Sequence, residues 1–131
     1  MDHRDARADT LKGPDMPDRF TQIVFSNPAE GKEAEFNEWY DTVHIPQLLE
    51  VPGMLSAKRF ALHDCDLYRV PGGQVPEHGY MCVYQMEGDV NTIMSEIRAR
   101  VADGRVTMSD CLDLPSSRMS FWTQQGDEFV A

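Results

Sequence analysis

The sequence predicts a single α+β domain whose elements follow the order β-α-β-β-α-β. Four short runs rich in aromatic and β-branched residues read as strands. Two longer segments carry apolar residues at spacings of three and four, which indicates amphipathic helices. The length of 131 residues suits one domain. This order is the ferredoxin-like split βαβ arrangement, a four-stranded antiparallel sheet with helices on one face.

The first strand is predicted over Arg19–Ser26, where Asn27-Pro28 closes an apolar run. A helix follows, which begins either at a cap formed by Asn27-Pro28 or, after a turn, near Gly31. Its apolar face is formed by residues spaced i, i+3, i+4 and i+7: Phe36, Trp39, Tyr40 and Val43.

Pro46 disfavours helical backbone at the residue before it, so the first helix is predicted to end or kink near His44. The sequence also allows a further helical turn over Gln47–Glu50. After this segment the sequence predicts a strand over Met54–Leu62, a long polar hairpin loop over Asp64–Gly79 and a strand over Tyr80–Met86. A second helix follows, capped by Asp89 or Asn91 and ending at Asp103, and the last strand is predicted over Arg118–Thr123.

The strands alternate poorly between polar and apolar residues. Ile23-Val24-Phe25 and Met81-Cys82-Val83-Tyr84 place apolar side chains on both faces of the sheet. A sheet that is covered on one face only should alternate. We therefore expect the second face to pack against another copy of the chain, as a face-to-face homodimer.

Composition excludes several classes of protein. Twelve basic and 22 acidic residues give a net charge of −10, which repels nucleic acid and anionic membranes. No segment has the length of apolar sequence that a membrane span needs. The segment Met1–Asp18 is charged and lacks the apolar centre of a secretory signal, so it is predicted to be a flexible tail before a domain over 19–131. Three widely spaced cysteines favour reduced thiols in the cytoplasm.

One stretch resembles a known family. The run Asn27–Pro46, above all Trp39-Tyr40-Asp41-x-x-His44-x-Pro46, together with Pro52-Gly53 and Ala57-Lys58-Arg59-Phe60, resembles the dimeric α/β-barrel superfamily and its EthD-like or related uncharacterised branches. The resemblance covers about Phe20 to Thr123. It implies a ferredoxin-like protomer that dimerises into a barrel, with a pocket between sheet and helices. The superfamily includes cyclases, lactone isomerases, cofactor-free monooxygenases, haem-degrading enzymes and members without known activity, and fold does not select among them.

His44 is the first candidate catalytic residue. It lies at the expected C-terminal end of a helix, where the dipole favours imidazolium, and Asp41 lies three residues earlier. Both effects would raise its pKa and suit it to acid–base work, with Asp41 as the orienting carboxylate. The alternative readings are a histidine that caps its helix and a solvated aspartate.

Tyr40 is the third candidate catalytic residue, because its hydroxyl could donate to a substrate oxygen. Trp39, Phe36 and Arg59 are assigned to substrate binding: the aromatic rings could stack on a flat ligand, and the guanidinium could hold a carboxylate. Core packing remains the alternative for the rings. For Arg59 the alternative is a salt bridge at the barrel rim, and its anionic partner could be Asp41 or Glu38 instead of a substrate carboxylate.

No metal or cofactor is expected. The chain lacks the glycine-rich phosphate loops, the GxSxG elbow and the HExxH motif, so nucleotide cofactors and serine-hydrolase chemistry are disfavoured. Several potential ligands gather at the ends of the long hairpin, but their spacing matches no recognised metal site: His63, Asp64, Cys65, Asp66, Glu77 and His78. The hairpin could equally act as a lid over the pocket.

The sequence thus predicts a small cofactor-independent enzyme. It would act on an apolar, aromatic or polycyclic oxygenated metabolite through histidine-based acid–base chemistry, as an isomerase, cyclase or lyase. Two alternatives stay open, a non-catalytic dimer that binds a hydrophobic ligand and a cofactor-free monooxygenase of a quinol-like substrate.

Overall fold

The computed structural model describes residues 18–131. The predicted tail over 1–18 lies outside this range except for Asp18, whose carbonyl oxygen accepts a hydrogen bond of 2.9 Å from the amide of Gly88. None of the helices in the described range is long and apolar enough to cross a membrane.

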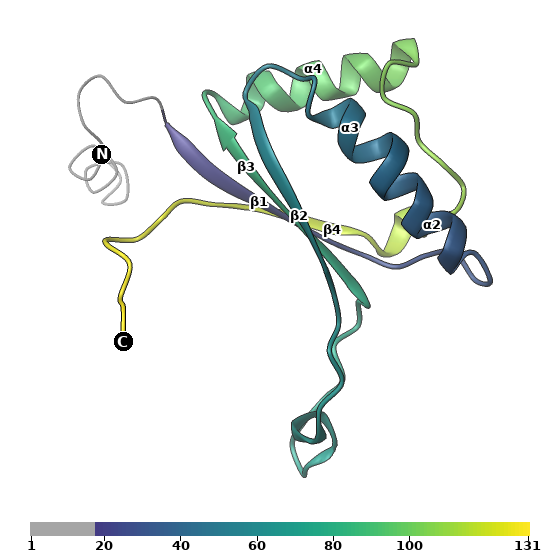
Figure 1. Ribbon diagram of the computed structural model, residues 1–131, viewed down its shortest axis with the longest axis vertical. Helices are drawn as coiled ribbons and strands as arrows, with labels where there is room; N and C mark the ends of the chain where they lie inside the picture. The colour runs from purple at the N-terminus through teal and green to yellow at the C-terminus, as the bar shows by residue number, and fades with distance from the viewer. Residues whose placement is uncertain (1–17) are drawn as a thin grey trace.

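Four strands form one antiparallel sheet, as Figure 1 shows. They are β1 (Arg19–Ser26), β2 (Met54–Ala61), β3 (Tyr80–Glu87) and β4 (Arg118–Trp122), in the spatial order β2-β3-β1-β4. The predicted α+β fold is confirmed, and each strand ends within one residue of its predicted boundary. A register shift after Met54 marks a bulge at the start of β2.

The first helical segment begins later than one of the two predicted starts. Pro28 does not open a helix but forms an isolated bridge with Leu112, and the amide of Ala29 donates to the carbonyl of Cys111 over 2.7 Å. The predicted cap at Asn27-Pro28 is therefore wrong. Helix α2 (Glu33–Trp39) starts after a turn through Gly31, as the alternative had it, and continues through η1 (Tyr40–His44) into α3 (Ile45–Leu48).

The second helix is confirmed at both ends. Helix α4 (Val90–Asp103) is capped by Asp89, whose carboxylate accepts a hydrogen bond of 2.8 Å from the amide of Thr92. Gly104 closes it with φ +88°, the left-handed conformation typical of a helix C-terminus.

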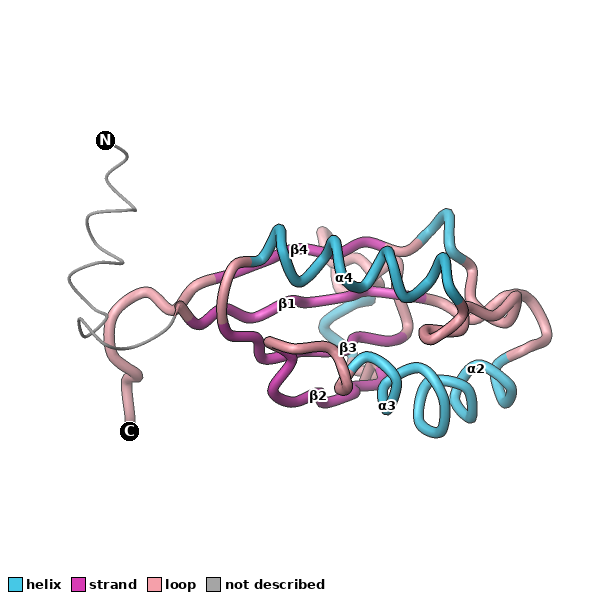
Figure 2. The backbone as a smooth tube through the Cα atoms, turned by 90° about the horizontal axis from the view of Figure 1, so that it is seen from above, coloured by secondary structure: helices cyan, strands magenta, loops and turns pink. Residues whose placement is uncertain are grey.

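Both helical segments cover the same face of the sheet (Figures 1 and 2). The core lies between them, on the even-numbered residues of β1 and β3. Two buried residues on this face are polar rather than apolar, Gln22 and Ser26 of β1. The side chains buried most completely come from α2, the turn after α3, β3 and the segment after α4: Phe36, Val51, Cys82, Tyr84, Met86, Val106 and Cys111.

The opposite face of the sheet has no helix over it within residues 18–131. Here the fractional exposures are 38 % for Phe25, 43 % for Phe60 and 59 % for Trp122. By alternation, their neighbours on this outer face include Ile23, Met81 and Val83. The outer face therefore carries an apolar patch, beside polar residues such as Lys58 and Gln85.

A long hairpin connects β2 and β3 and extends well past the end of the sheet in Figure 1. It contains a short 3-10 helix, Asp66–Arg69, and Arg69 donates to the Asp64 carboxylate over 2.6 Å. Leu67 and Val75 are exposed on it.

Gly53, just before β2, allows a close approach of three elements. Its φ is +98°, its carbonyl accepts from Glu87, and a Cβ there would lie 2.6 Å from the Ile93 side chain and 2.9 Å from the Glu87 carbonyl oxygen. We expect Gly53→Ala to lower the free energy of unfolding by about 2 kcal/mol or more, through strain and overpacking.

Urea unfolding measures this loss, with Gly104→Ala as the matched control. Gly104 has a similar positive φ of +88°, but a Cβ there would meet no atom within 4 Å. We expect the control to lose only about 1 kcal/mol, from the backbone conformation alone. Equal losses in the two variants would show that the close approach at Gly53 is unimportant.

Candidate functional site

The first helical segment contains one wide turn, Tyr40–His44, called the π-turn below. The amide of Ile45 donates to the carbonyl of Tyr40, five residues back instead of four. Pro46 explains the change, because it has no N–H for the Thr42 carbonyl and its ring would collide with that group in a regular helix. The predicted kink near His44 is therefore found as a widened turn, after which the helix resumes as α3.

The π-turn packs His44 against two aromatic rings. The imidazole stacks on Trp39 with 4.3 Å between ring centroids and 21° between ring planes, and it meets Tyr40 edge-on at 5.3 Å. Within the described residues, Nδ1 of His44 is the buried side-chain nitrogen or oxygen that lacks a hydrogen-bond partner. Such an atom is rare and costs about 1–3 kcal/mol, so it calls for a reason.

Trp39 is held in place by the segment that follows α4. Its indole Nε1 donates to the carbonyl of Thr107 over 3.1 Å. Gln47 binds the same residue twice, by donating to the Thr107 hydroxyl and by accepting from its amide. Trp39 is buried, so the structure places it as the support on which His44 stacks.

Burial lowers the pKa of His44 to about 4. The expectation of a raised pKa is wrong, for two physical reasons. The helix does not end at His44, so no free carbonyls favour its charge there. The Asp41 carboxylate pairs with Arg59 instead and makes no contribution to the pKa of His44. The imidazole is therefore neutral at neutral pH.

Arg59 on β2 is the centre of a second group of contacts. Its guanidinium donates to Asp41 over 2.9 Å and to the Asn37 side-chain carbonyl over 2.8 Å. Its carbon Cζ lies 4.8 Å from the centroid of Tyr40 and 5.6 Å from those of Phe36 and Tyr80. The Arg59 side chain is 18 % exposed, so this cation is enclosed by aromatic rings and balanced by one carboxylate.

Tyr40 joins the two groups, because its ring lies under Arg59 and against His44. It is buried, and burial raises the pKa of its hydroxyl, while a hydrogen bond with Ser26 and the charge of Arg59 oppose that rise. Phe36 is fully buried and packs edge-on against Tyr40 at 5.1 Å. The structure thus brings together all six residues predicted from the sequence, around one tyrosine ring.

The sequence reasoning missed several neighbours. Asn37 and Tyr80 complete the network: Asn37 donates to the Tyr80 hydroxyl over 3.3 Å, and that hydroxyl donates to Glu33 over 2.7 Å. Glu33, Asn37 and Asp41 are spaced i, i+4 and therefore form one polar row along the helix. This spacing could have pointed to Asn37. Gln22 could also have been found, as a polar residue at a core position of the first strand.

No group of three or more histidine, cysteine or acidic side chains within residues 18–131 could hold a metal ion. The two histidines at the ends of the long hairpin lie in different environments. His63 is exposed, and Nε2 of His78 lies 2.7 Å from the carbonyl oxygen of Ser116. All three cysteines are free.

The lowered pKa of His44 makes stability depend on pH. Its pKa is about 4 in the fold against an ordinary 6.5, so the unfolded chain binds the proton more readily. Stability therefore falls as pH drops from about 6.5 to about 4, and the His44 contribution to that loss is about 3 kcal/mol. Above pH 6.5 this contribution is constant.

The measurement is urea unfolding at pH 7 and pH 5, for the wild type and for His44→Phe. Phenylalanine keeps an aromatic ring next to Trp39 but does not titrate. We expect the variant to lose less stability than the wild type between these pH values. Identical losses would show that His44 is not held neutral by burial.

Two solved structures are similar to this chain. The first is a "putative monooxygenase" from Shewanella loihica PV-4, with a TM-score of 0.54 and 17 % identity, over 86 % of this chain and 99 % of that one. The second is an "ethyl tert-butyl ether d (ethd) family protein" from Bacillus halodurans C-125, with a TM-score of 0.49 and 20 % identity, over 86 % of this chain and 100 % of that one. No protein-family model and no curated protein matches the chain. At these identities the likeness is one of fold: the chain has the ferredoxin-like α+β fold that its sequence resemblance predicts.

Proposed function

We propose that this protein is a small cofactor-independent enzyme, in which the neutral imidazole of His44 moves a proton of an apolar, oxygenated aromatic or polycyclic substrate. The observation that carries the proposal is the unpartnered Nδ1 of His44. A structural histidine would satisfy that nitrogen, whereas a catalytic one keeps it available for substrate.

The protonation state supports a base rather than an acid in the resting enzyme. With a pKa of about 4, His44 is a neutral imidazole at neutral pH, so it lacks the acidic imidazolium proton and offers its unprotonated ring nitrogen as a base. The imidazolium that forms would be poorly solvated in this position, so its proton would be returned to another atom of the substrate. Acceptance at one atom and return at a second is an isomerisation, and loss of a leaving group in between is an elimination.

The other predicted site residues take supporting roles in this proposal. Trp39 and Phe36 hold the rings of His44 and Tyr40 by stacking and edge contacts. Asp41 holds Arg59, and the partly exposed guanidinium is the group that would bind an anionic oxygen of the substrate. Tyr40 lies between them and supplies a neutral hydroxyl.

Proton exchange in D2O tests the acid–base step before the natural substrate is known. A panel of aromatic and bicyclic ketones and lactones is incubated with enzyme, and deuterium incorporation next to the carbonyl is followed by proton NMR. We expect His44→Ala to lower the exchange rate by about 10²–10⁴-fold. His63→Ala is the matched control, because His63 is exposed on the long hairpin.

The results of these assays distinguish the proposed acid–base enzyme from a monooxygenase and from a non-catalytic binding protein. Exchange that survives His44→Ala within threefold would remove His44 from the reaction. Oxygen consumption with a panel of quinols, in an oxygen electrode, would instead support the monooxygenase alternative. Saturable ligand binding with neither exchange nor oxygen consumption would support the non-catalytic binding protein.

We also propose that the chain is a homodimer that pairs through the outer face of the sheet, in the cytoplasm, where its cysteines stay reduced. The support is the apolar outer face with Phe25, Phe60 and Trp122. A stable interface needs about 800 Å² from each partner, and a four-stranded sheet face offers a surface of that order.

Analytical ultracentrifugation of the wild type and of Phe60→Glu tests this pairing. A glutamate within the apolar interface would be buried without a partner, so we expect dimer in the wild type and monomer in the variant. Leu67→Glu, on the exposed hairpin, is the control. A wild-type monomer at micromolar concentration would contradict the homodimer.

A further inference from the structure

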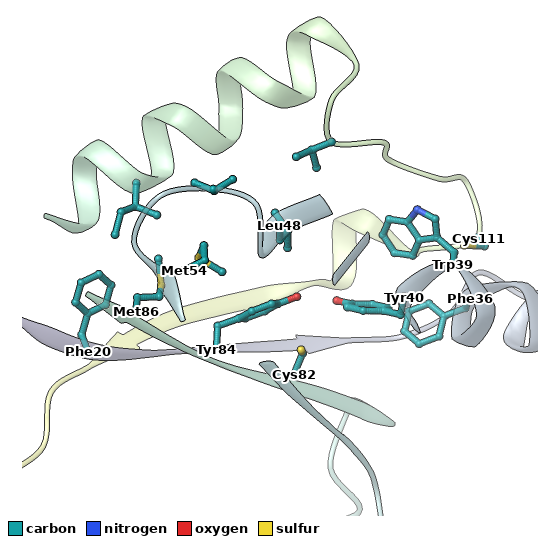
Figure 3. Packing of buried hydrophobic residues seen from close by; sticks show 13 residues of the cluster. Phe20, Phe36, Trp39, Tyr40, Leu48, Met54, Cys82, Tyr84, Met86 and Cys111 are labelled. Carbon is teal, nitrogen blue, oxygen red and sulfur yellow. The ribbon is translucent and has the colours of Figure 1, made fainter. Parts of the chain in front are cut away.

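Five side chains with polar or thiol groups lie together in the core between the sheet and the helices. Gln22 and Ser26 come from β1, Cys82 and Tyr84 from β3, and Tyr40 from the π-turn, and all are buried. Gln22 and Tyr84 are direct neighbours across the two strands. Figure 3 shows the hydroxyls of Tyr40 and Tyr84 pointing toward one another, with the Cys82 thiol between them on the sheet.

Two of these buried donors have sulfur as a neighbour. The amide nitrogen of Gln22, a residue 4 % exposed, donates to Sδ of Met119 over 3.6 Å. The hydroxyl of Tyr84, a residue 2 % exposed, has the Cys82 thiol as its side-chain partner. Sulfur is a weak acceptor, and buried polar groups normally find better ones. An oxygen atom placed between the two phenols would therefore bind more strongly than the sulfur does.

Tyr40 also has a proton to offer. Its hydrogen bond with Ser26 favours the ionised phenol, so Ser26 would help to stabilise negative charge at the Tyr40 oxygen. Burial raises the pKa of both Tyr40 and Tyr84, so both hydroxyls keep their protons at neutral pH.

We propose that the hydroxyls of Tyr40 and Tyr84 bind the carbonyl oxygen of the substrate and donate to the oxyanion that it becomes. This inference rests on the proposed function and names its substrate class: a flat β,γ-unsaturated ketone or lactone with a C–H bond next to the carbonyl. Tyr84 is then a catalytic residue that the sequence analysis did not identify.

The electrons balance without a further reagent. Nδ1 of His44 takes the proton from the carbon next to the carbonyl, and the C–H bonding pair becomes a C=C bond. The carbonyl π pair moves onto oxygen, which accepts hydrogen bonds from Tyr40 and Tyr84. In a substrate with a C=C bond between its β and γ carbons, the imidazolium returns the proton to the γ carbon, the γ pair of electrons forms the new C–H bond, the C=C bond shifts to the α,β position, and the carbonyl is restored.

The arrangement also compensates for the weak base. An imidazole with a pKa of about 4 takes a proton from carbon only if the negative charge that forms is stabilised at the same time. Two phenol donors in a buried position, where hydrogen bonds to an anion are strong, supply that stabilisation. Tyr40 touches the base as well, since its ring meets His44 at 5.3 Å.

The probe for this site is 2-naphthol, a flat apolar phenol whose ionised form mimics the enolate oxygen. Its apparent pKa is measured free and bound to the full-length protein, from the distinct fluorescence of naphthol and naphtholate. We expect wild-type protein to lower the pKa of the bound probe. Tyr84→Phe and Tyr40→Phe should each weaken naphtholate binding by about tenfold to a hundredfold, the usual effect of one hydrogen bond to a charged group.

Tyr68→Phe is the matched control, because Tyr68 is also hydrogen-bonded to a cysteine thiol, that of Cys65, but lies on the long hairpin. We expect it to leave naphtholate binding within twofold of wild type. Thermal unfolding of Tyr84→Phe checks that the fold is kept, which we expect because the variant loses only a bond to sulfur.

His44→Gln separates this inference from the proposed function. We expect it to retain the tight binding of naphtholate and to lose the proton exchange. If wild-type protein shows no saturable binding of 2-naphthol, or if Tyr84→Phe binds naphtholate as well as wild type does, the oxygen site is overturned. Loss of exchange in His44→Ala would then still support acid–base chemistry with a different oxyanion partner.

Discussion

The structure of the site depends on one hydrogen bond that proline cannot make. Pro46 leaves the Thr42 carbonyl without its regular helical donor, and the chain responds with a five-residue turn instead of ending the helix. That wider turn brings residues 39, 40 and 44 into mutual contact as three aromatic rings. A regular helix would have spread the same side chains over a larger arc. Single wide turns of this kind are frequent at functional sites.

Tyr40 separates two environments that differ in charge. On one side the Arg59 guanidinium is enclosed by rings and paired with Asp41, so charge is present and balanced. On the other side His44 is neutral and stacked on Trp39, so charge is excluded. A tyrosine suits this boundary, because its ring face accepts a cation while its edge and hydroxyl serve the uncharged side.

The order of elements could be read from the sequence, because apolar spacing reports local backbone directly. Asp89 and Gly104 were identified at the ends of α4 for the same reason, since helix caps are local. The sequence offered Asp41 as one of three possible partners of Arg59, beside Glu38 and a substrate carboxylate, but local spacing could not choose among them. Arg59 lies eighteen positions after Asp41, and only the packing of the helix on β2 brings the two within reach.

The prediction of a raised pKa for His44 was wrong for a related reason. The argument from a helix terminus assumed that the helix stops where proline begins, and the wide turn removes that terminus. Tyr84 was hidden because it belongs to a run that is apolar on both faces, in which no single residue stands out. Its importance comes from the hydroxyl that faces it across the core (Figure 3).

The hydrogen bonds at Thr107 couple two parts of the chain that are distant in sequence. Trp39 and Gln47 bind this one residue from the helix side, and Val106 beside it is buried. The π-turn therefore cannot move away from the sheet unless the segment after α4, which contains Val106 and Thr107, is released with it. Such tied segments open together as one cooperative unit. Amide hydrogens in the segment after α4 should thus exchange together with those of the π-turn.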